Sequence, residues 1–171
     1  MPVHCAIYGE EECAQMKYQC AEFVSRSLAA AGFIQNIDPY RSSVWDLIEY
    51  ESYGVQYNLG FASKQHGFLG LKEYLENHPD RWQKFMCTPF LYGDDNILYN
   101  NEENRQRTVA SGVCRPELIR AGTVVIMKNG RHSGVGVDVN RVNTHNPARF
   151  QNSFEELAHF PINFIFVPLF Y

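Results

Sequence analysis

The sequence lacks the features that mark nucleic-acid-binding, membrane-spanning and repeat proteins. There is no basic excess, because 15 lysine and arginine residues stand against 19 aspartate and glutamate residues and give a net charge of −4. Neutralising phosphates needs a basic surface, so we expect no nucleic-acid partner. No apolar run approaches the ~20 residues of a membrane span, so we expect no membrane association either. Internal repeats, low-complexity tracts and linkers are also missing.

Cysteine and targeting patterns are equally sparse. The five cysteines show no paired spacing, which indicates reduced thiols rather than a disulfide framework. No Cys-x-x-Cys or His-x-x-x-His pair occurs, so we expect no metal site and no cofactor. The first five residues have neither the basic nor the apolar region of a signal peptide, which predicts a protein that is cytoplasmic as synthesised. Export as an effector stays open.

The first two thirds of the chain have mostly helical patterns. Apolar residues recur at helical spacing over residues 13–32, and Gly32 is a plausible stop. Ser43 and Asp46 resemble a helix cap, residues 69–77 fit a second helix, and a third could start at Pro79 and carry Trp82, Phe85 and Met86 inward. The polar segment 92–107 reads as a long loop.

From residue 116 the pattern changes to strands. Residues 123–127 and 132–139 form a predicted hairpin around Asn129-Gly130, followed by strands near 142–145 and 162–171 and a short helix capped by Ser153 and Glu156. Helices first and an antiparallel sheet second indicate an α+β fold. At 171 residues the chain is most simply one domain, residues 1–171.

Cys20 lies near the start of the first predicted helix, and a histidine, His132, opens a later strand. A thiol is mostly protonated near neutral pH, and a helix N-terminus and an imidazolium both favour the reactive thiolate. Backbone N–H groups at the helix start could also receive a tetrahedral oxyanion. The alternative for Cys20 is a small buried core thiol, and for His132 a half-exposed strand residue beside a turn.

Three segments together resemble a known family. They are Tyr-Gln-Cys-Ala-Glu-Phe-Val at 18–24 followed by Arg26, Arg-Ala-Gly-Thr-Val-Val at 120–125, and His-Ser-Gly-Val-Gly-Val at 132–137. They are similar to the papain-like amidases of the CHAP and NlpC type. The resemblance covers the helix that carries Cys20 and residues 118–146.

This resemblance implies a papain-like fold, in which an N-terminal nucleophile helix packs on a small antiparallel sheet. Residues 33–117 would then be a helical or loop insertion, or a lid. The resemblance further implies Cys20 as nucleophile, His132 as base and His145 as the third, orienting residue. Asn143 and Asn146 are alternatives for that third position, because an amide can also fix the imidazole ring. Gly134 and Gly136 leave room for a helix or a substrate backbone to approach.

The implied activity is amide hydrolysis, with peptidoglycan stem peptides cut through an acyl-enzyme on Cys20. The partners would be a peptide or peptidoglycan-fragment substrate and an inhibitor or immunity protein. Acyl transfer, or polyamine-conjugate amidase activity on the same fold, is an alternative. A non-catalytic binding module is another, although retention of both Cys20 and His132 argues against it.

Overall fold

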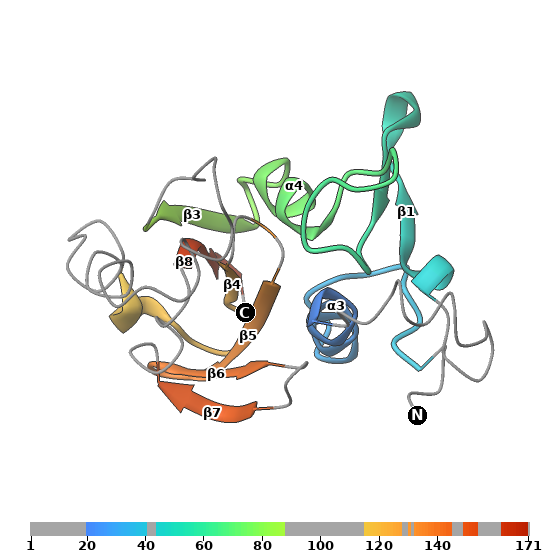
Figure 1. Ribbon diagram of the computed structural model, residues 1–171. Helices are drawn as coiled ribbons and strands as arrows, with labels where there is room; N and C mark the ends of the chain where they lie inside the picture. The colour runs from blue at the N-terminus through green and yellow to red at the C-terminus, as the bar shows by residue number, and fades with distance from the viewer. Residues whose placement is uncertain are drawn as a thin grey trace, which may run out of the picture.

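The computed structural model describes residues 20–40, 44–87, 115–127, 130, 132–144, 149–153 and 162–170. These residues combine a few helices with two antiparallel sheets, which is an α+β arrangement (Figure 1). The helical elements are α3 (Cys20–Ala30), α4 (Leu71–Glu76) and the 3₁₀ helices η1 (Val44–Leu47), η2 (Ser52–Gly54) and η3 (Pro116–Leu118). No helix in these ranges is long and apolar enough to cross a membrane.

The large sheet has six strands in the order β3-β8-β4-β5-β6-β7. In chain order they are β3 (Trp82–Met86), β4 (Val124–Met127), β5 (His132–Asp138), β6 (Arg141–Thr144), β7 (Arg149–Ser153) and β8 (Ile162–Pro168). The predicted hairpin is confirmed as the β4–β5 pair, in which Met127 lies opposite His132 and Ile126 opposite Ser133. The small sheet pairs β1 (Ile48–Tyr50) with β2 (Gln56–Asn58).

Helix α3 has the amphipathic face that the sequence predicts. Val24 and Leu28 are fully buried on one side, and the side chains of Glu22 and Arg26 form an ion pair of 3.1 Å one turn apart. Gly32 ends the helix as expected, with a φ of +83°, and the N–H of Phe33 bonds back to the carbonyl of Leu28 at 2.8 Å. The part of the predicted helix before Cys20 lies outside the described residues.

Two expectations about secondary structure were wrong. The predicted third helix is the edge strand β3, and Met86 is 48% exposed rather than turned inward. The apolar residues of β3 recur at helical spacing, but the segment pairs with β8, and this pairing provides hydrogen-bond partners for backbone groups of both strands. Where a helix was expected after Ser43, residues 44–47 form only the 3₁₀ helix η1, and strand β1 follows directly. Ser153 ends strand β7, and the short helix that it was expected to cap lies outside the described residues.

The two faces of the large sheet pack into separate apolar clusters. Helices α3 and α4 cover one face, and buried residues of this helix-side cluster include Val24, Leu28, Tyr57, Leu71, Leu75, Val124, Ile126, Val135 and Phe166. The opposite-face cluster contains Cys87, Ile119, Val125, Met127, Val142, Ile162, Ile165 and Val167. In Figure 1, α3 lies between the large sheet and the small sheet.

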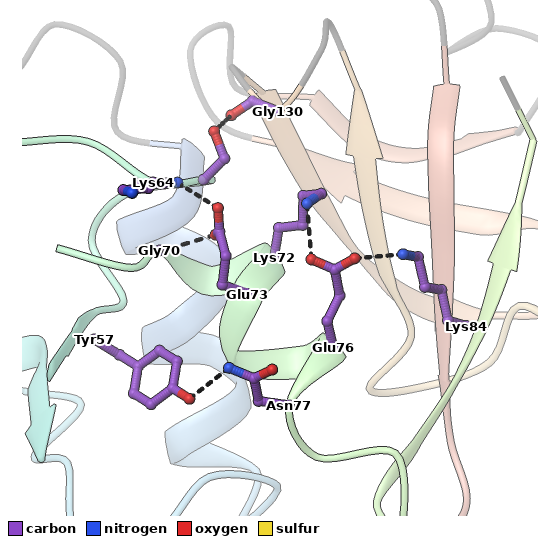
Figure 2. Close-up of polar contacts among 10 residues, drawn as sticks. Tyr57, Lys64, Gly70, Lys72, Glu73, Glu76, Asn77, Lys84 and Gly130 are labelled. Carbon is purple, nitrogen blue, oxygen red and sulfur yellow. Dashed lines mark hydrogen bonds and ion pairs between the residues drawn. The ribbon is translucent and has the colours of Figure 1, made fainter. Parts of the chain in front are cut away.

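Polar contacts fasten the segment before α4 to its surroundings (Figure 2). The Glu73 carboxylate accepts hydrogen bonds from the N–H of Lys64 at 2.8 Å and of Gly70 at 3.2 Å. The hydroxyl of Ser63 donates to the carbonyl of Gly130 at 2.8 Å, just before strand β5 begins. The loop between β2 and α4 therefore lies beside Gly130, two residues before His132.

Candidate functional site

Cys20 is the first residue of α3, and its side chain is 1% exposed. The helix packs against strand β5, which starts with His132 and Ser133. Two segments more than 100 residues apart in the printed sequence thus meet at the N-terminal end of the helix. The elements that carry Cys20 and His132 are therefore in contact, although the two side chains do not share a face of the sheet.

The surroundings of the thiol act on its pKa in opposite directions. Burial raises the pKa of Cys20, and this is the dominant effect. Hydrogen bonds from the backbone and the hydroxyl of Ser133, and from the N–H groups of Ala21 and Cys20 itself, lower it. The net shift is upward, so the thiol is protonated at neutral pH in this state. The same donors form a ready-made set of hydrogen bonds for negative charge on the sulfur.

Alternation along β5 decides which side chains face α3. Ser133 lies opposite Ile126, and both Ile126 and Val135 belong to the helix-side cluster. His132 lies opposite Met127, which belongs to the opposite-face cluster. Directly paired residues have their side chains on the same face of a sheet. The side chain of Ser133 therefore points towards α3, and that of His132 points to the opposite face. The imidazole is 7% exposed.

Of the three candidates for the third, orienting position, the structure describes only Asn143. Asn143 lies opposite Val135 on β6 and therefore shares the face that α3 covers. Its side chain is partly buried. His145 and Asn146 lie outside the described residues, so the choice among the three stays a prediction.

The two glycines of β5 are approached by the protein itself. A Cβ added at Gly136 would lie 2.4 Å from the carbonyl oxygen of Arg120. At Gly134 a Cβ would lie 2.7 Å from a methyl group of Val142 and 2.9 Å from one of Thr144. The room that the sequence reserves here is therefore occupied by the preceding turn and by β6, rather than by a helix or a substrate.

Ser133 is a site residue that sequence reasoning missed. It is fully buried, its hydroxyl has no hydrogen-bond partner among the described residues, and it lies beside the thiol of Cys20, whose pKa it lowers. The signal was present in the sequence, because a small polar residue stands between His132 and two glycines where a strand core would favour an apolar one. Its significance depends on which face of β5 the helix covers.

The remaining cysteine chemistry differs from expectation at one position. Cys87 is disulfide-bonded, to a cysteine outside the described residues, so the expectation of reduced thiols throughout is wrong. Cys20 is a free thiol. Within the described ranges, no group of three histidine, cysteine, aspartate or glutamate side chains is placed to hold a metal ion.

Comparison with protein-family models, with curated proteins and with solved structures gives no match to this chain.

Proposed function

We propose that the protein is a cysteine-dependent amide hydrolase with a papain-like fold, in which Cys20 is the nucleophile and His132 the base. One observation carries the proposal. The sulfur of Cys20 lies at the start of α3, within reach of hydrogen bonds from the helix N-terminus and from Ser133, the residue next to His132. Helix N-termini and nearby donors are the environments that activate a cysteine.

The reaction would proceed through an acyl-enzyme. His132 takes the proton of the Cys20 thiol, and the thiolate attacks the amide carbonyl carbon to give a tetrahedral oxyanion. The oxyanion collapses, the C–N bond breaks, and the amine leaves with the proton from the imidazolium. Water, deprotonated by the imidazole, then hydrolyses the thioester to a carboxylic acid and restores the thiol. N–H groups at the start of α3 stabilise the oxyanion.

This mechanism makes two demands on the geometry. The imidazole of His132 must turn from its own face of β5 towards Cys20, and a carbonyl must reach a sulfur that is 1% exposed. His132 is the first residue of its strand, where the backbone is least constrained by pairing on both sides. Catalytic hydrogen bonds are often long in free enzymes and tighten only when substrate binds.

For the substrate we propose peptidoglycan stem peptides, on the resemblance of residues 18–24 and 120–137 to the CHAP and NlpC amidases. A peptide or peptidoglycan fragment suits a protein with exposed aromatic rings, such as Trp45 on η1, which packs against α3. The disulfide of Cys87 favours an oxidising compartment and therefore export as an effector, with an inhibitor or immunity protein as partner.

Acyl transfer is the second candidate, and burial of the sulfur favours it. A site that excludes water prolongs the life of an acyl-enzyme, and an amine can then take the acyl group in place of water. Hydrolysis and transfer use the same first half-reaction. Polyamine-conjugate amidase activity differs only in the amine that leaves.

The test is incubation with purified peptidoglycan, with mass spectrometry of the released fragments, with and without an added amine. Hydrolysis predicts a new carboxylic acid in both cases, whereas transfer predicts a new amide only when the amine is present. Cys20→Ala and His132→Ala should abolish both products, while His66→Ala, which removes an exposed histidine, should not. Cleavage that survives Cys20→Ala would exclude this nucleophile. Fragments that bind without being cut would favour the binding module.

A further inference from the structure

We propose that Ser133 is a positioning residue for Cys20, which holds the sulfur of the nucleophile from strand β5 through its hydroxyl and its N–H. This inference rests on the proposed function in one respect only, since it takes Cys20 to be the nucleophile. It adds a residue and a role that the resemblance does not supply.

The first step is the placement of the serine. Ser133 is fully buried on the face of β5 that α3 covers, and Val135, two residues further on, packs in the same cluster as Val24 and Leu28. Helix and strand are therefore held together by apolar contacts one to two helical turns from Cys20. This packing brings the Ser133 hydroxyl and the Cys20 sulfur together without a flexible linker.

The second step concerns the hydrogen bonds of the serine hydroxyl. A buried hydroxyl needs a partner, and Ser133 Oγ has none among the described residues, although the thiol of Cys20 lies beside it. When the thiol loses its proton, the hydroxyl can donate to the sulfur, and the N–H of Ser133 donates from the same residue. A hydrogen bond to a charged group is stronger than one to a neutral group, so the pair favours the thiolate over the thiol.

The third step concerns the charged groups around Cys20. On its own helix, Glu22 and Arg26 pair with each other. On β5 and β6, Asp138 and Arg141 lie opposite one another at the far end of the strands, and η1 contributes Asp46. Among the titratable residues of β5, His132 is therefore the nearest in sequence to the contact between Ser133 and Cys20. Ser133 carries no charge at any working pH, so its effect should be constant while that of His132 titrates.

The experiment measures the rate at which a small alkylating reagent modifies Cys20, peptide by peptide, across the neutral and mildly alkaline pH range. Ser133→Ala should slow the reaction about tenfold or more at each pH, because a smaller fraction of the sulfur is thiolate. Alanine is smaller than serine, so reagent access can only improve, and a slower rate cannot arise from access. Ser133→Thr retains the hydroxyl and should restore most of the rate.

The matched control is Ser25→Ala. Ser25 is also a fully buried serine, but on α3, where its hydroxyl bonds the carbonyl of Leu59, and it should change stability without changing the alkylation rate. An equal or faster rate in Ser133→Ala would overturn the inference. If that variant does not fold, Ser133→Val and Ser133→Thr, which have the same shape, make the same comparison. Peptidoglycan cleavage is scored separately, so either idea can fail while the other stands.

Discussion

The surroundings of Glu49, on β1, disfavour the ionised form of its carboxyl group. Its pKa is raised, first because the fold partly buries it and also because the Glu51 carboxylate lies near, while His78 and Arg81 oppose the shift. One of its oxygens is buried without a hydrogen-bond partner among the described residues. The imidazole of His78 contacts Glu51 instead. Ionisation of Glu49 therefore works against the folded state.

We predict that Glu49→Gln stabilises the protein near neutral pH. A carboxyl whose pKa is raised by folding costs stability as the pH rises from its unfolded value through its folded value, and an amide of the same shape avoids that cost. The gain should be present at about pH 7 and absent at about pH 3, where both states are protonated. Urea unfolding at the two pH values measures it.

Glu51→Gln is the control for Glu49→Gln. It removes the carboxylate that contacts His78 and that lies near the hydroxyl of Tyr57 at 3.4 Å, so it should destabilise at neutral pH. A gain of the same size in both variants would mean that general relief of negative charge, rather than burial of Glu49, is responsible.

The residues of the candidate site were only partly predictable. Cys20 and His132 could be chosen because their residue types and local patterns are typical of a nucleophile and base. Ser133 could not, because alternation gives a strand two faces without telling which one a helix will cover. The disulfide of Cys87 was equally hidden, since no spacing in the sequence shows which cysteines meet in space.

At the scale of elements, strands β4, β5, β6 and β8 were predicted because their residues are apolar or alternate and their turns carry asparagine and glycine, whereas β7 was not predicted. Asn140 and Gly130 indeed have positive φ angles, of 56° and 81°. Strand β3 was not predictable, because what makes Trp82–Met86 a strand is the open edge of β8, eighty residues further along in sequence. The local spacing of apolar residues predicts a helix in this segment, whereas pairing with β8 makes it a strand.

Gly136 shows why an element can need a residue without a side chain. The turn at residues 119–123 docks on β5 through hydrogen bonds from Gly136 N–H to Thr123 O at 2.6 Å and from Gly122 N–H to Gly136 O at 3.2 Å. We predict that Gly136→Ala destabilises by about 1–3 kcal/mol, because its Cβ would overlap the carbonyl of Arg120. Val137→Ala, at the exposed neighbouring position, should cost much less. Urea unfolding that ranks the two equally would contradict this.

Helix α4 and strand β3 are joined by Glu76, whose carboxylate contacts both Lys72 and Lys84 (Figure 2). Burial raises the pKa of Glu76, but the hydrogen bonds and charges of the two lysines outweigh it, so the pKa is lowered. The stabilisation is complete above the unfolded pKa and is lost as the pH falls through the folded value. Glu76→Gln should therefore cost about 0.5–1 kcal/mol at neutral pH and nothing at low pH. Denaturation with urea at both pH values would reveal an effect independent of pH if the prediction is wrong.

At the scale of the whole molecule, strand β8 connects parts that are distant in sequence. It pairs with β3 on one side and β4 on the other. Its alternate residues enter both apolar clusters, with Phe164 and Phe166 on the helix side and Ile162, Ile165 and Val167 on the opposite face. Neither face of the sheet can be complete without this strand, so we expect the helices and the sheet to unfold together.

Phe166 is the residue that tests this coupling. It is fully buried, it lies between Lys84 of β3 and Val124 of β4, and it packs in the same cluster as Leu28 of α3. Phe166→Ala should lower the free energy of unfolding by about 3–5 kcal/mol, through lost apolar contacts and the cavity that remains. Leu169, just past the end of the strand, is 52% exposed, so Leu169→Ala should change the free energy by no more than about 0.5 kcal/mol.

Two probes of the same unfolding transition decide whether the coupling holds. In a Trp45→Phe background, tryptophan fluorescence reports on buried Trp82 in β3, while far-ultraviolet circular dichroism at the helical minimum reports mainly on α3 and α4. Because β8 supports both, the two transitions should coincide in the parent and should move together in Phe166→Ala. If only the fluorescence transition moved, the strand β3 edge would melt independently of α3. The packing that holds Cys20 against β5 would then not depend on β8.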